Sequence, residues 1–340
     1  MMPKESNVQR KTHKKSHFTR YMLLGIVLLL FAFIVSIIVG EAHVDLKTIG
    51  QAILQYDPSN QAHNVIVEIR LPRDIGAVMV GMALAVSGAV IQGVTKNGLA
   101  DPSLIGLNAG AAFALACAFA LLPGAPFLVL ILISFAGAIF GGTLVLTIGN
   151  SRRDGFNPMR LILAGAAVSA LLTALSQGIA LFFRLNQSIN FWNAGGISST
   201  TWQHLYISVP LILVVIILLM LMRRQLTILS LGESIAKGLG QNTKIISLSA
   251  LLLTMLLAGI SVAMVGQIAF VGLIIPHLVR FLIGTEYEKI LPLSALFGGT
   301  LVLVADILAR LLGETPMSAI ISFIGVPFFL YLIKKGGRLN

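Results

Sequence analysis

Long apolar stretches alternate with short polar or glycine- and proline-containing segments along almost the whole chain. Each stretch is close in length to the roughly 20 residues that a helix needs to cross the hydrocarbon core of a bilayer. The pattern predicts ten membrane-spanning helices, at residues 21–39, 75–92, 104–122, 127–148, 161–183, 205–221, 245–262, 268–283, 291–308 and 318–333. Because the connections are short, we expect an all-α polytopic membrane protein with one compact bundle over residues 21–338.

Composition agrees with this class. Hydrophobic residues make up 56% of the 340 residues, charged residues only 11%, and the mean hydropathy is +0.92, which excludes an ordinary soluble domain. The single cysteine, Cys117, lies in a Gly/Ala-rich stretch, so we expect a packing role and no disulfide within the chain. The apolar run after residues 1–20 lacks a small-residue cleavage site, which predicts a basic cytoplasmic tail and a retained first span.

Basic residues are distributed unevenly between the predicted loops. The net charge of +11 would suggest nucleic acid as a partner of a soluble protein. If the N-terminus is cytoplasmic, however, all but five of the 24 Lys and Arg residues fall in cytoplasmic segments. The five outside are Lys47, Arg70, Arg73, Arg184 and Arg310. By the positive-inside rule, both termini of a multi-pass protein are cytoplasmic, and no nucleic acid is expected as partner.

Residues 227–240, TILSLGESIAKGLG, predict a short helix on the cytoplasmic side. Ser230 and Glu233 have the spacing of a capping box, and Glu233 and Lys237 that of an i, i+4 ion pair. Two glycines could end the helix, Gly238 and Gly240. Three aliphatic side chains share one face: Leu231, Ile235 and Leu239. Such a helix either lies on the membrane surface or docks in a groove of a cytoplasmic partner, and the pattern leaves both interpretations open.

Two glycine-interrupted connections lie at opposite faces of the predicted bundle. Residues 97–106, NGLADPSLIG, follow the second span, and residues 265–277, VGQIAFVGLIIPH, follow the seventh. Each is either a plain turn or part of a gate, because irregular backbone near a membrane must be buried in protein or line an aqueous path. Together they are typical of an inverted internal repeat. Small-residue pairs that predict close helix packing are Gly106/Gly110 and Gly137/Gly141.

Few residues inside the spans could carry chemistry. The acidic and histidine residues there are Asp306, near a span end, and His277, which has no second ligand at a metal-binding spacing and is interpreted as packed. The lack of a midplane carboxylate disfavours an ion-coupled carrier. No G-x-x-x-x-G-K-[ST] loop or catalytic motif occurs, so we expect no catalytic residue, no metal site and no ATP site on this chain.

Three outward arginines have two open interpretations. Arg70 and Arg73, in RLPR, precede the second span, and Arg310, in ADILAR, closes the ninth. Each is either an interfacial anchor or, if the three converge in space, part of a docking patch for an acidic partner.

Six sequence blocks occur in an order and spacing that characterise one family. They are RLPR at 70–73, SGAVIQGVTKNGLADPSLIG at 87–106, SLGESIAKGLG at 230–240, IAFVGLIIPHLVR at 268–280, ADILAR at 305–310 and IGVPFFLYLI at 324–333. From residue 21 to residue 338, the chain resembles the permease subunits of the iron-siderophore and cobalamin branch of ABC importers, a ten-span, FecCD-like type II family. It departs from the family pattern at Gly98 and Gln267, where proline is common, and at Ser318, where glycine is frequent.

The resemblance implies a subunit of the bacterial cytoplasmic membrane that works with several partners. These are a second permease subunit, a cytosolic ATPase dimer that binds ATP and Mg, and an extracytoplasmic substrate-binding protein. The implied substrate is a ferric siderophore, of hydroxamate type, with cobalamin or haem as alternatives. No cofactor is expected on this chain.

The resemblance also implies roles for individual residues. Those that would couple the chain to the ATPase are Leu229, Ser230, Leu231, Gly232, Glu233, Ala236, Leu239 and Gly240. Those that would meet carboxylates of the binding protein are Arg70, Arg73 and Arg310. Those at the cytoplasmic gate positions are Asn97, Leu99, Pro158 and Met159.

Overall fold

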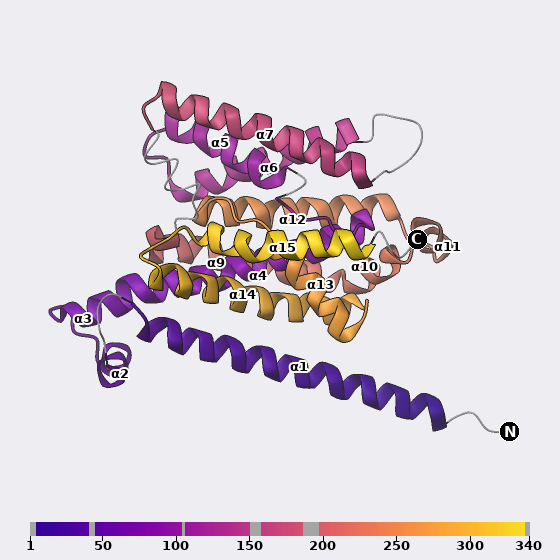
Figure 1. The fold of residues 1–340 in the computed structure, drawn as a ribbon, viewed down its shortest axis with the longest axis horizontal. Coiled ribbons are helices and arrows are strands. Elements are labelled where there is room, and N and C mark those ends of the chain that lie inside the picture. Colours follow the sequence, from indigo (N-terminus) through magenta and orange to yellow (C-terminus); the bar gives the residue numbers. More distant parts are fainter. Residues whose placement is uncertain (1–4, 41–44, 104–105, 150–157, 186–196, 337–340) are drawn as a thin grey trace.

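The computed structural model describes residues 5–40, 45–103, 106–149, 158–185 and 197–336, and every regular element within these ranges is helical (Figure 1). Ten apolar helices correspond to the ten predicted spans. They are α1 (Glu5–Ile38), α4 (Leu71–Thr95), α5 (Leu107–Leu121), α6 (Phe127–Gly149), α7 (Pro158–Phe182), α9 (Trp202–Leu221), α12 (Thr243–Val265), α13 (Val271–Ile283), α14 (Tyr287–Leu311) and α15 (Met317–Gly336). The predicted all-α polytopic membrane fold is confirmed.

Two of these helices are too short to cross a membrane unaided. Eight helices among the described residues have the length and hydropathy of a span, whereas α5 has 15 residues and α13 has 13. At 1.5 Å per residue, both fall well below the roughly 30 Å of a hydrocarbon core. The ten predicted spans thus comprise eight full-length helices and two partial ones.

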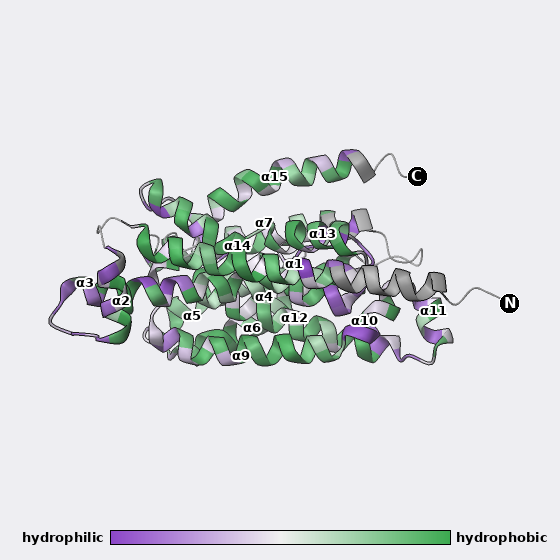
Figure 2. Cartoon of the chain, turned by 90° about the horizontal axis from the view of Figure 1, so that it is seen from below, coloured by the Kyte–Doolittle hydropathy of each residue, from purple (hydrophilic) through white to green (hydrophobic). Residues whose placement is uncertain are grey.

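Short helices lie at the two polar ends of the bundle. Near one end are α2 (Leu46–Leu54), α3 (Gln61–Asn64) and the π-helical turn η1 (Val65–Arg70), which leads directly into α4, with the 3₁₀ turn η2 (Ile197–Ser199) packed against α4. At the other end are α10 (Arg223–Ser230) and α11 (Glu233–Gly238). Figure 2 shows hydrophobic residues along the middle of the helices and hydrophilic ones concentrated towards the ends. Such banding is what a chain surrounded by lipid requires.

The packing of the helices has the pattern of an inverted repeat. Helix α4 packs against α13 and α14, and α12 packs correspondingly against α5 and α6. Within each group the remaining helices contact one another in the same order, α5–α6–α7 and α13–α14–α15. Because corresponding helices are five positions apart in the series of ten, the two groups run in opposite directions. In agreement, α5 lies towards the α2–α3 end and α13 towards the α10–α11 end (Figures 1 and 2).

Glycines set the distance between the central helices. A Cβ atom on Gly88 of α4 would lie 2.0 Å from the carbonyl oxygen of Gly272 in α13, and one on Gly110 would lie 2.2 Å from that of Gly137. The second pair confirms the close approach predicted from the small-residue spacing. Helix α4 is the most enclosed of the long helices, and all functional features described below are built on it or on its neighbours.

Two smaller predictions concern α1 and His277. Helix α1 begins at Glu5, so the described part of the basic segment is helical and leads directly into the first candidate span, which begins at His17. The His277 ring packs edge-on against Phe328, with ring centroids 5.8 Å apart, which confirms its interpretation as a packed histidine.

Candidate functional site at the two polar ends of the bundle

A buried charge network lies at the α2–α3 end. Arg73 Nε donates to both carboxylate oxygens of Asp306, at 3.0 and 3.1 Å. Its two terminal nitrogens form a parallel pair of bonds with Glu314, at 3.0 and 2.8 Å. One guanidinium thus ties α4 both to α14 and to the turn after α14. This fork-to-fork geometry is the strongest arrangement an Arg–carboxylate pair can have.

Arg310 extends the same network to α1. Its Nη2 lies 3.0 Å from Asp74 Oδ1 and 3.1 Å from Asp306 Oδ2. Ser36 of α1 donates to Asp74 Oδ1 at 2.7 Å, and its carbonyl oxygen accepts from Arg310 Nη1 at 3.0 Å. Arg70 reaches the same helix, since its Nη1 donates to the Ile37 carbonyl at 2.6 Å.

The three arginines therefore converge, as the docking hypothesis requires, but they are not exposed. The side chains of Arg73 and Arg310 are 8% and 5% exposed, and Arg70 is also buried. Each already has partners within the chain, so the three do not form a free cationic surface. Sequence reasoning missed the counter-ions Asp74 and Glu314, although both lie beside the motifs it identified, in RLPRD and in the turn after ADILAR.

The predicted cytoplasmic gate begins where α4 ends. Lys96 has a left-handed backbone (φ 51°) and closes α4. Asn97 is buried, and its Oδ1 accepts from the Leu99 amide at 3.0 Å, which fixes a tight turn. Leu99 itself is partly buried. Pro158 and Met159 form the start of α7, and their side chains lie outside the described residues.

The two irregular connections meet inside the bundle. Asp101, which is buried, accepts from the Ser103 amide at 2.8 Å through Oδ1. Its Oδ2 lies against the first turn of α13, where a Cβ atom on Gly272 would be only 2.8 Å from it. Asn108 Nδ2 in the first turn of α5 donates to the Ile268 carbonyl at 3.0 Å. Each connection thus contacts the helix that belongs to the other repeat.

The predicted coupling segment forms two short helices rather than one. Helix α10 ends at Ser230, Gly232 (φ 127°) turns the chain, and α11 begins at Glu233. The predicted capping box is wrong, because Ser230 Oγ donates to the Thr227 carbonyl at 2.7 Å inside α10 and Gly232 occupies the N-cap of α11. Only glycine readily adopts the conformation that this corner needs.

The predicted ion pair and the predicted glycine end of this segment are both present in the structure. Lys237 Nζ lies 2.8 Å from Glu233, and this bond holds the pKa of the Glu233 carboxyl below its usual value. Gly240 (φ 78°) ends α11 in a Schellman motif, with bonds from Gly240 N to the Lys237 carbonyl and from Gln241 N to the Ala236 carbonyl.

The segment is anchored on one side and exposed on the other. Leu229 and Ala236 are buried. The three predicted face residues are each more than half exposed: Leu231, Ile235 and Leu239. The α10–α11 corner thus presents an aliphatic surface at a polar end of the bundle.

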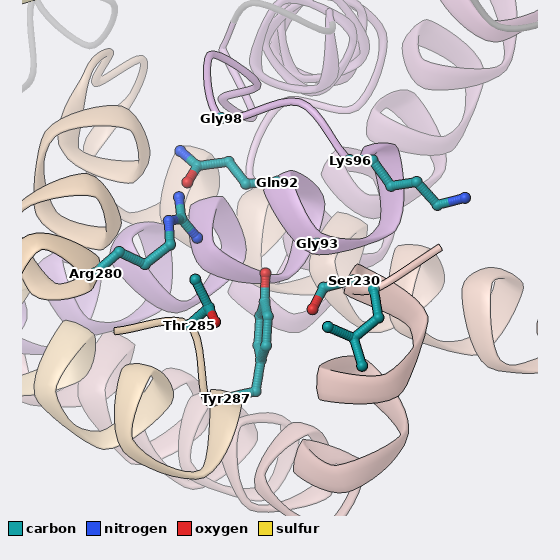
Figure 3. A pocket seen from close by; sticks show the side chains of 9 residues that line it. Gln92, Gly93, Lys96, Gly98, Ser230, Arg280, Thr285 and Tyr287 are labelled. Atoms are coloured by element: carbon teal, nitrogen blue, oxygen red, sulfur yellow. The ribbon is translucent and has the colours of Figure 1, made fainter. Parts of the chain in front are cut away.

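A pocket of about 270 Å³ opens beside this corner (Figure 3). Its walls come from the end of α4, the turn at Gly98 that follows α4, the end of α10 and the connection between α13 and α14. The lining residues are Gln92, Gly93, Lys96, Gly98, Ser230, Leu231, Arg280, Thr285 and Tyr287. No sequence motif indicated this pocket, because its residues are far apart along the chain.

Comparison with known proteins agrees with this architecture. The FecCD transport family matches residues 28–335. The chain is 44% identical over 320 residues to the iron(3+)-hydroxamate import system permease protein FhuB of Bacillus subtilis, covering 93% of this chain and 83% of that protein. It is 37% identical to the hemin transport system permease protein HmuU of Yersinia pestis, covering 92% and 96%. A solved metal-chelate type ABC transporter in an inward-facing conformation matches with a TM-score of 0.78 and 30% identity, covering 93% of this chain and 99% of that chain.

A lipid-compatible bundle with an inverted repeat, two partial helices and a polar surface at each end defines an integral membrane transport protein. The chain belongs to the FecCD transport family, which comprises permease subunits of ABC importers for siderophores and other metal chelates. The family resemblance inferred from the six sequence blocks is confirmed. Within the described residues, no group of three or more His, Cys, Asp or Glu side chains could hold a metal ion.

Proposed function

We propose that this chain is one of two permease subunits that carry a ferric siderophore of hydroxamate type across the bacterial cytoplasmic membrane. The observation that carries the substrate class is the 44% identity to an iron-hydroxamate permease, against 37% to a haemin permease and 38% to a ferric dicitrate permease. Haem and cobalamin are the alternative substrates.

The exposed aliphatic corner supports an ATPase partner. Leu231, Ile235 and Leu239 would be covered by a groove of a cytosolic ATPase dimer, which would hold ATP and Mg. Burial of such side chains provides the main favourable free energy of association. The uneven distribution of basic residues supports an orientation with this corner and both termini in the cytoplasm.

The outer network supports a restricted version of the docking hypothesis. Because Arg70, Arg73 and Arg310 are buried and paired, a carboxylate of an extracytoplasmic binding protein would have to compete with Glu314, whose side chain is 48% exposed. Docking would then replace one ion pair with another. Glu314→Gln should accelerate binding-protein association at low salt if Arg73 contributes, and leave it unchanged if Arg73 serves only within the chain.

Reconstitution tests the proposal. The complex is purified from native membranes with its co-eluting chains, placed in vesicles with ATP at the ATPase face, and supplied with binding protein. Uptake of a ferric hydroxamate is compared with that of ferric citrate, haem and cobalamin. ATP-dependent uptake of the ferric hydroxamate alone supports the proposal. Preference for another ligand overturns the substrate class, and uptake driven by an ion gradient without ATPase overturns the ABC mechanism.

A further inference from the structure

The pocket beside the α10–α11 corner has an unusual charge balance. Its lining contains two cationic side chains, Lys96 and Arg280, and no carboxylate. In the close-up, Arg280 enters from the left and Tyr287 from below, whereas the Lys96 side chain extends to the right, with its amine directed away from them (Figure 3). The cavity therefore has a positive lining at a point where four segments of the chain meet.

Arg280 is the more deeply placed of the two cations. Its guanidinium hydrogen-bonds to Tyr287, whose hydroxyl in turn donates to the Ala89 carbonyl at 2.9 Å. Its Nη2 is buried and has no hydrogen-bond partner, and no carboxylate of the described chain lies within ion-pair distance of it. A partly buried guanidinium without a counter-ion is unfavourable, and a carboxylate is the group whose two oxygens match its paired N–H groups.

The position of the pocket identifies the source of such a carboxylate. Ser230 and Leu231 belong both to the pocket and to the proposed coupling segment, so the pocket continues the surface proposed to meet the ATPase. Helix α10, whose end lines the pocket, packs against both α4 and α14. The continuity of the pocket with the proposed ATPase surface favours a side chain of a docked protein over a lipid headgroup.

We propose that this pocket is a carboxylate-binding socket, into which an Asp or Glu side chain of the cytosolic ATPase inserts beside Leu231 to pair with Arg280, with Lys96 at the rim. The proposal rests on the proposed function, from which it takes the partner. It also specifies how the two proteins are linked. The inserted side chain would contact both α10 and the turn at Gly98, which belongs to the predicted cytoplasmic gate. A movement of the ATPase would therefore be transmitted directly to that gate.

Carbodiimide cross-linking of the purified complex tests the contact. The reagent activates a carboxylate, and the Lys96 amine, if adjacent, displaces the urea to form an amide. Mass spectrometry should find Lys96 joined to an Asp or Glu of the ATPase, in the nucleotide-free or the ATP-bound complex. Lys96→Gln should abolish this product, whereas Lys244→Gln, on the first turn of α12, should not.

Variants of Arg280 test the pairing. Arg280→Gln should reduce ATP-driven uptake roughly tenfold or more, because one partner of a buried charged pair is lost. Arg280→Lys should restore part of the activity, since it keeps the charge. Replacing the cross-linked acid of the ATPase by its amide should give the same loss, with no further loss in the double variant. Additive losses overturn the pairing.

A cysteine at Ile235, cross-linked to ATPase cysteines, separates the two proposals. If Ile235→Cys forms a disulfide with the ATPase but Lys96 is joined to this chain's own acids or to none, the socket is wrong and the coupling surface stands. If neither cross-link forms, the proposed ATPase interface is itself wrong. Loss of a co-purifying phospholipid in Arg280→Gln, with unchanged ATPase coupling, would assign the pocket to lipid and overturn the socket.

Discussion

Asp306→Asn should destabilise the protein strongly, because this carboxylate is the centre of the buried network. It is fully buried and receives bonds from Arg73 and from Arg310. Removing one partner of a buried ion pair costs about 3 to 5 kcal/mol. Glu314 and Asp74 would still face the two arginines, so the expected loss lies at the lower end of this range, about 3 kcal/mol.

Glu314→Gln provides the comparison within the same network. The Glu314 side chain is 48% exposed, so solvent weakens its ion pair and the expected loss is about 0.2 to 1 kcal/mol. Glu288→Gln provides the control, because Glu288 pairs with Arg223 at 3.4 Å on the exposed surface at the opposite end. It should have no measurable effect.

The thermal stability of the three variants and of the unchanged protein is measured by heating in detergent, followed by size-exclusion chromatography of the protein that remains folded. Asp306→Asn should lower the apparent midpoint by at least about 5 °C, with Glu314→Gln close to the control. Since membrane proteins often unfold irreversibly, all samples need the same heating time. If Asp306→Asn is as stable as Glu288→Gln, the network does not hold α1, α4 and α14 together.

Three further predictions concern packing, coupling and topology. Gly88→Ala should prevent correct packing of α4 on α13, because the added Cβ would lie 2.0 Å from a backbone oxygen. Gly178→Ala is the control, since nothing lies within 4 Å of a Cβ there, and it should be neutral or stabilise α7 by up to about 1 kcal/mol. Equal yields of folded protein from the two variants would contradict this. Ile235→Asp should leave membrane insertion intact and reduce ATP-driven uptake and ATPase stimulation, because the side chain is 52% exposed on the proposed coupling surface; normal uptake would return α11 to a membrane-surface role. In a chain without its native cysteine, Asn60→Cys should react with an impermeant thiol reagent in intact cells and Gln241→Cys should not; the reverse result would invert the topology.

Hydropathy was sufficient to predict the helices because every helix that crosses the bilayer needs a run of apolar side chains. It also predicted that Arg73 and Arg310 lie at the same end of the bundle, as they do. It could not show that these residues are buried, because their partners Asp306, Glu314 and Asp74 are brought to them by the packing of α4 against α14. That packing depends on glycine contacts between residues more than 200 positions apart, such as Gly81 and Gly298.

The coupling segment shows a local limit of sequence reasoning. Ser230 and Glu233 have the spacing of a capping box, but that motif requires the serine to leave the helix. Here Ser230 is retained in α10 by its bond to the Thr227 carbonyl, and Gly232 makes the corner instead. In a capping box the serine oxygen would accept from a backbone amide, whereas here it donates to a carbonyl and α11 has no side-chain cap. Retention of Ser230 in α10 accompanies the packing of α10 against α4 and α14. The pocket at Arg280 depends on that packing as well.

Bonds from α4 and α5 to the second irregular connection tie the two repeats together. Asn108 in α5 donates to the Ile268 carbonyl, and Gln92 in α4 donates to the Gly272 carbonyl at 2.9 Å. Because these bonds reach from the first repeat to the second, a shift of either repeat alone would break them. The two repeats are therefore expected to move together, so that a change at one face of the membrane is accompanied by a change at the other.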